Sequence, residues 1–281
     1  MKGNHKIAFF TNVFTTYHNH STWSDGAASI REMALAAKAA GACEFGISDH
    51  LVVGPRDFFE DARYWSMGLR CFPLYFEEAQ RVKAELETDD FRIRIGVEAD
   101  FFPETVEKVN RFLAQFPLDY IIGAVHFAGN FPVDCCREFW ESATAAQREL
   151  LWQKYVRLIS QCAAEFSCDW LAHVDLAKKF GYLPSEECVL EMEALLERCG
   201  RNGMPIEVNT AGWDKLCNEA YPSLRLLQKA VSCGVEFLIN ADAHAVNQIA
   251  RHFGEARTQL AALGVKEVLA FEGRRRRRVP L

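Results

Sequence analysis

Hydrophobic positions along the chain alternate between short continuous runs and longer stretches with helical spacing. The apolar runs predict seven strands, at residues 9–17, 44–48, 93–97, 120–125, 170–172, 205–208 and 235–239. Several runs are almost free of polar residues, which is typical of parallel strands buried on both faces. Helical spacing predicts helices between and after them, at residues 28–40, 75–87, 104–116, 145–166, 185–199, 221–233 and 245–263.

This alternation predicts an α/β protein with a parallel sheet, which either stays open or closes into a barrel. No linker rich in Ser, Gly or Pro and no fixed repeat divides the chain, so we expect residues 1–281 to form a single domain. Arginine occupies every position from Arg274 to Arg278. We expect residues 273–281 to be a flexible basic tail.

The composition limits the classes of function. Of the 281 residues 49% are hydrophobic and 25% are charged, and the net charge of −6 predicts no general attraction to nucleic acid or to a membrane. No apolar run is long enough to cross a bilayer, and residues 1–14 lack the apolar segment of a secretory signal, so we expect a cytoplasmic protein. The ten cysteines include no C-x-x-C pair, and we interpret them as reduced, buried side chains. Nothing in the sequence indicates an oligomeric state.

Most of the eight histidines lie at or just after the C-terminal end of a predicted strand: His18, His20, His50, His126, His173 and His244. In parallel α/β folds this end of the sheet carries the active site. Three carboxylates, on Asp25, Glu98 and Asp242, have similar positions. His18 and His20 are two residues apart on a strand, so their side chains share a face and can bind one ion together.

Imidazole and carboxylate groups without thiolates favour zinc, manganese or iron as bound metals. Nine candidate ligands are too many for one ion, so we predict two or three divalent metal ions. Asp49 and Asp175 lie close to a candidate ligand in the sequence. We expect them either to orient histidines or to cap the helices that follow.

The ordered series of motifs resembles the polymerase and histidinol phosphatase (PHP) family of metal-dependent phosphoesterases. The motifs are His-Asn-His with Asp25, Ser-Asp-His ending at His50, Gly-Val-Glu-Ala-Asp around Glu98, Ile-Gly-Ala-Val-His ending at His126, Ala-His-Val-Asp around His173, and Asp-Ala-His ending at His244. The likeness covers nearly the whole chain. It leans towards the histidinol-phosphatase branch, because Lys178 to Phe180, Glu207 to Thr210 and Glu219 to Ser223 resemble that branch.

The resemblance implies a distorted seven-stranded (β/α) barrel of the PHP type with a trinuclear metal centre. The implied ligand sets are His18, His20, Glu98 and Asp242 for one ion, Glu98, His126 and His173 for a second, and Asp25, His50 and His244 for a third. The implied reaction is hydrolysis of a small phosphate monoester, L-histidinol phosphate, to L-histidinol and phosphate in histidine biosynthesis.

The resemblance also suggests catalytic roles. Glu98 would bridge two ions, and Asp242 or His244 would protonate the leaving group. Arg56 is a candidate for binding the substrate phosphate, with a plain surface arginine as the alternative. Of Lys178 and Lys179, one is expected either to reach the site or to pack against the outer helices.

Three departures from the family pattern concern the substrate rather than the metals. Ala211 stands where a serine is expected, Asp214 stands where a basic residue is expected, and Ala241 stands where a serine often precedes Asp-Ala-His. An alternative is therefore a PHP phosphoesterase that acts on another small phosphate ester or on nucleotides. A barrel that binds metal only for structure or regulation is a third interpretation, which the complete set of candidate ligands disfavours.

Overall fold

Short parallel strands form the centre of the molecule in the computed structural model, which describes residues 14–55 and 65–281. Their bounds are β1 (Phe14–Thr16), β2 (Ala42–Ile47), β3 (His50–Leu51), β4 (Arg92–Ile95), β5 (Glu98–Asp100), β6 (Ile122–Ala124), β9 (Trp170–Leu171), β10 (Ile206–Asn209) and β11 (Phe237–Asn240). They form a three-stranded sheet in the order β1-β2-β4 and a six-stranded sheet in the order β11-β10-β9-β6-β5-β3.

The two sheets are continuous through bent strands. Two residues separate β2 from β3, and two separate β4 from β5, so the parallel pairing of β2 with β4 continues as the pairing of β3 with β5. Between β1 and β11 the described residues form one parallel bridge, Asn19 with Ala243, rather than a ladder. The seven predicted strands are therefore neighbours in an α/β fold, as expected, although no continuous ladder closes a barrel in the described part of the chain.

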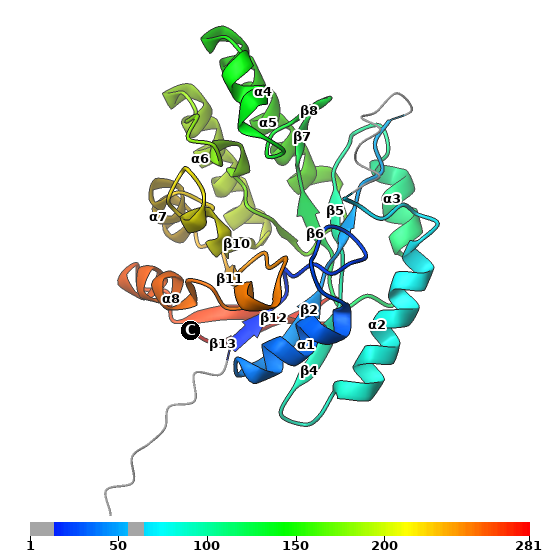
Figure 1. The fold of residues 1–281 in the computed structure, drawn as a ribbon. Helices are drawn as coiled ribbons and strands as arrows, with labels where there is room; N and C mark the ends of the chain where they lie inside the picture. Colours follow the sequence, from blue (N-terminus) through cyan, green and yellow to red (C-terminus); the bar gives the residue numbers. More distant parts are fainter. Residues whose placement is uncertain (1–13, 56–64) are drawn as a thin grey trace, which may run out of the picture.

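Helices surround the strands (Figure 1). Their bounds are α1 (Ile30–Ala39), α2 (Phe72–Leu86), α3 (Val106–Leu113), α4 (Arg137–Ser142), α5 (Ala145–Glu165), α6 (Glu186–Asn202), α7 (Leu224–Ser232) and α8 (Phe253–Ala262), with short 3₁₀ turns η2 (Leu176–Lys178), η3 (Thr210–Asp214) and η4 (Val246–Gln248). Local sequence fixes the starts of two of the helices. Capping boxes, Ser29 with Glu32 and Thr144 with Gln147, satisfy backbone N–H groups at the first turns of α1 and α5.

Two elements differ from the sequence-based expectation. Helix α4 was not predicted, and the segment predicted to be helical from residue 245 begins its helix only at Phe253. Residues 245–252 instead contain η4 and a turn in which His252 has a left-handed φ of 55°. As a result this segment stays next to the candidate site and does not join the outer layer of helices.

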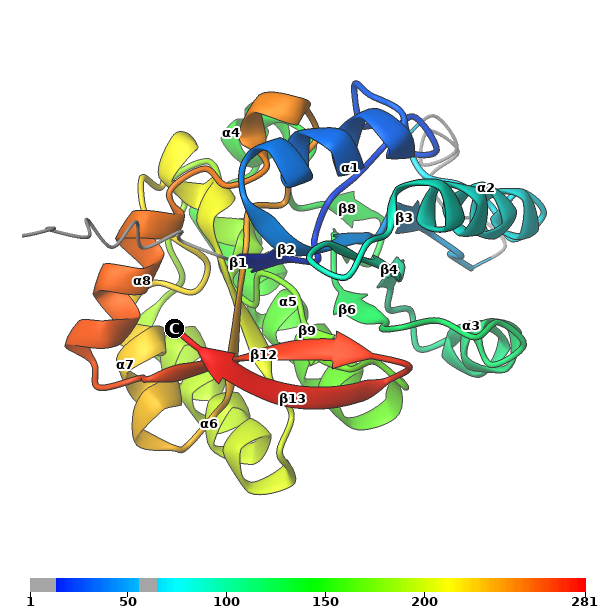
Figure 2. The ribbon, with the colours of Figure 1, turned by 90° about the horizontal axis from the view of Figure 1, so that it is seen from below.

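The expectation of a flexible tail at residues 273–281 is wrong. Residues Arg275–Pro280 form strand β13, which pairs antiparallel with β12 (Glu267–Glu272) over six residue pairs. Figure 2 shows this hairpin lying across the lower end of the central strands. The arginine charges are compensated by carboxylates distant in sequence: Arg274 pairs with Asp169, Arg277 with Glu44 and Arg278 with Glu236.

The hairpin closes a buried aromatic cluster inside the strands. Tyr17, Tyr120 and Trp170 pack there with Leu269 and Phe271 of β12. A larger apolar cluster lies between the strands and the outer helices. These two clusters hold the strands firmly below the end that carries the candidate ligands.

A second hairpin, β7 (Phe127–Ala128) with β8 (Phe131–Pro132), follows β6.

All ten cysteines are free, although only Cys162, Cys188 and Cys199 are buried. The prediction of buried cysteines is therefore confirmed for these three residues, whereas Cys71 and Cys135 are exposed. In the described residues no helix combines the length and apolar character needed to span a membrane.

Candidate metal centre

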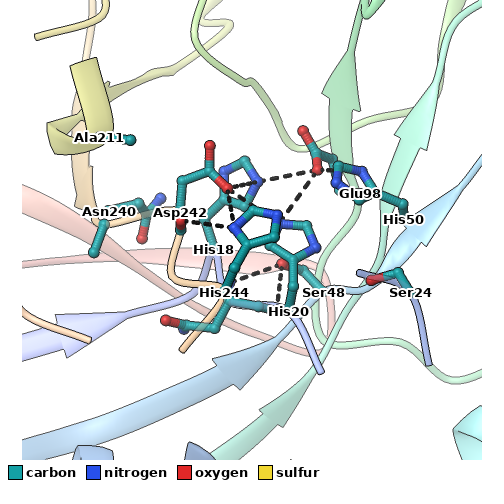
Figure 3. Close-up of polar contacts among 12 residues, drawn as sticks. His18, His20, Ser24, Ser48, His50, Glu98, Ala211, Asn240, Asp242 and His244 are labelled. Carbon is teal, nitrogen blue, oxygen red and sulfur yellow. Dashed lines mark hydrogen bonds and ion pairs between the residues drawn. The ribbon is translucent and has the colours of Figure 1, made fainter. Parts of the chain in front are cut away.

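All nine candidate ligands converge at the C-terminal end of the strands. His18, His20 and Asp25 follow β1, His50 begins β3, Glu98 begins β5, His126 follows β6, His173 follows β9, and Asp242 and His244 follow β11. Figure 3 shows the polar atoms of His18, His20, Glu98, His50, Asp242 and His244 facing one another. Arg56, the predicted phosphate-binding residue, lies outside the described residues.

Glu98 lies at the centre of this group. Its side chain is completely buried, and its two oxygens lie within 3.6 Å of nitrogens from five histidines. Oε2 contacts His50 at 2.8 Å, His18 at 3.1 Å and His20 at 3.5 Å, and Oε1 contacts His173 at 3.0 Å and His126 at 3.6 Å. One carboxylate with its oxygens directed to different imidazoles has the arrangement of a bridging ligand.

Two further carboxylates complete the group on the side of the cavity. Asp242 Oδ1 lies 3.2 Å from His20 Nε2, 3.5 Å from His244 Nδ1 and 3.6 Å from His18 Nε2. Asp25 Oδ1 lies 3.2 Å from His244 Nε2 and 3.7 Å from His50 Nε2.

Side-chain geometry gives four overlapping groups that could each hold an ion. They are His20, Asp25, His50 and His244; His18, Glu98 and His173; His18, His20 and Asp242; and His50, Glu98 and His126. The first contains the third ligand set implied by the resemblance, with His20 added. Each of His18, His20, His50 and Glu98 belongs to two of the four groups, so adjacent ions are compatible with this geometry. The exact ligand set of each ion stays a prediction.

Buried polar atoms without hydrogen bonds provide a test of metal binding. Among the residues that the structure describes, four buried atoms lie at ion-pair distance from one another but make no hydrogen bond of acceptable geometry: His18 Nε2, His20 Nε2, Glu98 Oε2 and Asp242 Oδ1. Native proteins rarely leave such atoms unsatisfied. Nitrogen and carboxylate oxygen are suitable ligands for zinc, manganese and iron, so these residues fit a group of divalent cations.

The electrostatics agree with this interpretation. Burial would raise the pKa of Glu98, but positive charge on His18, His50 and His126 holds it well below its usual range. Burial lowers the pKa of His50, yet Glu98 and Asp25 raise it to about 9. Without ions, protons on some imidazoles therefore supply the cationic charge that the buried carboxylates require.

His20 behaves differently. Burial, followed by the charges of His244 and His50, lowers its pKa to about 3. Its ring is therefore neutral at physiological pH, which leaves a nitrogen lone pair available for a metal ion.

Two buried carboxylates that sequence reasoning missed hold the candidate ligands in place. Glu207 in β10 lies 3.0 Å from His18 Nδ1 and accepts a hydrogen bond from the backbone N–H of His173 at 3.1 Å. Asp100 lies 2.5 Å from His126 Nδ1. A carboxylate on the far nitrogen of a metal-binding imidazole fixes its tautomer and ring orientation.

Asp49 and Asp175 have other partners in the structure. Asp49 accepts hydrogen bonds from the backbone N–H groups of Ser21 and Ser24, at 2.7 and 3.1 Å, and so anchors the loop that carries Asp25. Asp175 accepts one from the backbone N–H of Ser223 at 2.8 Å and pairs with Lys178 at 2.9 Å.

A cavity of about 390 Å³ opens beside the candidate ligands. Beyond the ligands themselves, its lining includes Trp65, Asp134, Lys179, Lys215, Tyr221 and Arg251. Lys178 is buried and does not line the cavity, so of the neighbouring pair Lys178 and Lys179 it is Lys179 that reaches the site. Its ammonium lies 3.1 Å from a carboxylate oxygen of Asp134.

Lys215 is different from the other cations of the cavity, because no described carboxylate lies within ion-pair distance of it. Burial and the neighbouring charges of Lys179 and Arg251 lower its pKa. An anion in the cavity would relieve this repulsion.

Comparisons with known proteins agree with the ordered motifs. The model of the PHP domain matches residues 16–211. A protein of Deinococcus radiodurans named "Probable histidinol-phosphatase" is 35% identical over 240 residues, which cover 85% of this chain and 88% of the relative. The DNA polymerase/3′-5′ exonuclease PolX of Bacillus subtilis is 28% identical over 268 residues, which cover 90% of this chain but 40% of that protein.

A solved structure confirms the fold class. The histidinol phosphate phosphatase of Lactococcus lactis subsp. lactis, crystallised with zinc, L-histidinol and phosphate, has a TM-score of 0.80 at 22% identity. The match covers 94% of this chain and 99% of that one. The domain match and the relatives together establish that this chain belongs to the PHP domain family, in its histidinol-phosphatase branch.

Proposed function

We propose that this protein is a metal-dependent phosphatase that hydrolyses L-histidinol phosphate to L-histidinol and phosphate, a reaction of histidine biosynthesis. The observation that carries the proposal is the buried carboxylate of Glu98 among five imidazoles, beside a cavity of about 390 Å³. Relatives across most of the chain are named histidinol-phosphatases, which supports this substrate. Residues 1–281 would act as one metallophosphoesterase domain.

We propose two or three divalent ions, held by the three ligand sets that the family resemblance implies. Zinc is the metal bound in the Lactococcus lactis enzyme, and manganese and iron accept the same ligand types. Bound ions would supply positive charge for the phosphate oxygens and lower the pKa of a coordinated water. Glu98 would keep adjacent ions together by placing negative charge between them.

The chain's own residues would orient the ester. Lys215, which lacks a carboxylate partner among the described residues, would pair with the substrate phosphate at the cavity wall. Asp242 and His244 line the same cavity, with 15% and 31% of their side chains exposed. We propose that one of these two residues supplies the proton that the leaving oxygen of histidinol requires.

The cavity favours a small substrate. Its volume of about 390 Å³ is typical of small-molecule sites, and Trp65 and Tyr221 provide aromatic surface for a planar imidazole ring. The net charge of −6 gives no general attraction to a nucleic acid backbone. The likeness to the PolX protein nevertheless keeps nucleotides as the second candidate substrate class.

The test is phosphate release by zinc-loaded protein from histidinol phosphate, sugar phosphates, other amino-alcohol phosphates and nucleotides. We expect the highest kcat/KM for histidinol phosphate. Higher kcat/KM for a nucleotide would establish the alternative substrate class. No release from any ester, in protein shown to contain zinc, would leave a structural or regulatory metal site as the better interpretation.

A further inference from the structure

The backbone at Asp242 has an unusual conformation. Its φ is 50°, in the left-handed region that residues other than glycine rarely adopt. In the proposed site the same residue supplies a carboxylate to the metals, 3.2 Å from His20 Nε2. Strained backbone at such a position persists only when surrounding contacts hold it.

Arg251 makes those contacts. Its Nη2 donates hydrogen bonds to the backbone oxygens of Ala241 at 2.8 Å and Asp242 at 2.9 Å, and its Nε donates to Ala241 at 3.0 Å. The planar guanidinium thus binds two successive carbonyl groups of the turn. Its side chain is only 13% exposed, and its own backbone oxygen accepts a hydrogen bond from Thr210 at 2.7 Å.

Asp214 holds the guanidinium from the other side. One carboxylate oxygen of Asp214 lies 3.4 Å from Arg251 Nη1, and the other lies 2.8 Å from His252 Nε2. Asp214 and Ala241 are two of the three positions that depart from the family pattern. Arg251 contacts both of them, so these two departures belong to one local arrangement.

We propose that Arg251 is a positioning residue for Asp242. It holds the left-handed turn and thereby directs the Asp242 carboxylate to the metal ions, while Asp214 orients the guanidinium. Nε and both hydrogens of Nη2 are used on carbonyl oxygens, and Nη1 faces Asp214, so little of the group is free to bind phosphate. This inference rests on the proposed metal site, because it concerns the aim of one of its ligands.

The experiment measures zinc binding to chelator-treated protein by competition with a chromophoric chelator. Lysine presents a single ammonium and cannot bind both carbonyls in the same plane. We expect Arg251→Lys and Arg251→Ala to bind one zinc ion about 10- to 100-fold more weakly, as is usual when a group that orients a ligand is removed. Asp214→Asn should weaken the binding of the same zinc ion by a smaller factor.

Kinetics and rescue distinguish positioning from a general loss of structure. At saturating zinc, the Arg251 variants should have a KM for histidinol phosphate within about twofold of the wild type. At limiting zinc, their kcat should fall in proportion to their weaker zinc affinity. Added guanidinium ion should restore part of the zinc affinity of Arg251→Ala, because it can occupy the vacated position. Arg257→Lys, on α8, is the matched control and should bind zinc like the wild type.

The outcomes separate the two proposals. Wild-type protein that takes up no zinc would overturn the metal site and the inference with it. If the wild-type protein binds zinc and Arg251→Lys binds it equally well, the inference about Arg251 is overturned while the metal site stands. Unchanged zinc affinity with a strongly raised KM would make Arg251 a phosphate-binding residue instead.

Discussion

Glu98 shows why single residues in this site depend on bound cations. A buried carboxylate is costly unless opposite charge surrounds it. Protons on His18, His50 and His126 provide this charge in the metal-free protein and hold the pKa of Glu98 low. Divalent ions would replace those protons, because both oxygens of Glu98 lie close to imidazole nitrogens.

Replacing Glu98 by glutamine should remove activity and metal together. The amide is neutral and cannot compensate two adjacent cations, so we expect kcat to fall at least about 100-fold, the upper end of the effect of losing an outer partner. Metal content, measured by atomic emission, should fall by one ion or more. Glu107→Gln, at an exposed position of α3, is the control. A Glu98→Gln protein with full metal content and activity would contradict the bridging role.

Glu207 permits a separate prediction about the orientation of His18. Besides His18, its oxygens accept hydrogen bonds from the side-chain amides of Asn209 at 2.8 Å and Asn240 at 2.9 Å. An amide at position 207 would set an N–H group against one of these donors, so we expect Glu207→Gln to bind zinc about 10- to 100-fold more weakly. Competition with a chromophoric chelator measures this, and wild-type affinity would show that Glu207 has no such role.

At the scale of elements, the β12–β13 hairpin forms the floor beneath the site. Phe271 of β12 is 2% exposed, and its ring lies 5.0 Å from that of Trp170. The hairpin therefore completes the aromatic cluster inside the strands. Four of its five arginines pair with carboxylates from other parts of the described chain, which makes a basic segment compatible with ordered structure.

Phe271→Ala should destabilise the protein without changing its chemistry. Removing a buried phenylalanine typically lowers the free energy of unfolding by about 3–5 kcal/mol. Urea unfolding followed by fluorescence measures this, and kcat of the folded variant should stay near the wild-type value. The control is Arg275→Ala, because Arg275 is exposed and makes no ion pair with the described residues. Arg275→Ala should change the free energy of unfolding by no more than about 0.5 kcal/mol. Equal changes for the two substitutions would mean that the hairpin is not part of the core.

The strands and the candidate ligands could be predicted from sequence because both depend on local order. Six of the seven predicted runs are followed within three residues by a candidate histidine or carboxylate, the run at 205–208 being the exception, and parallel strands bring such ends together. The hairpin could not be predicted, because the arginines are stabilised by Glu44, Asp169 and Glu236, which only the fold brings near.

The supporting residues of the site show the same limit. Asp100 is two residues from Glu98 on the same strand, so its position on the same face was a usable signal. Glu207 reaches His18 across 189 positions of sequence, and no pattern within β10 indicates that contact. The role of Arg251 likewise depends on a turn at residues 245–252, where helical spacing predicted a helix.

At the scale of the whole molecule, the candidate ligands join segments from both ends of the chain. They follow or begin β1, β3, β5, β6, β9 and β11. Bound ions would therefore connect β1 to β11, which in the described residues are joined by a single bridge, Asn19 with Ala243. Metal binding to the folded state therefore adds directly to its stability.

Removal of the metals should lower the midpoint of thermal unfolding. At free zinc 100 times its Kd, each independent ion contributes about 2.7 kcal/mol. For a chain of this size we expect a loss of at least about 5 °C per ion after chelation. Differential scanning calorimetry before and after reloading measures the change. Identical unfolding of the chelated and reloaded protein would contradict a set of ions that connects the strands.

The most direct test of the central claim is phosphate release from histidinol phosphate during stepwise reloading of chelator-treated protein with zinc. Glu98 is shared by at least two of the candidate ligand groups, so one ion should not suffice. We predict almost no release without zinc, and full activity only after two or three equivalents per chain. Full activity in protein that contains no metal, or no activity at any zinc loading, would contradict the account.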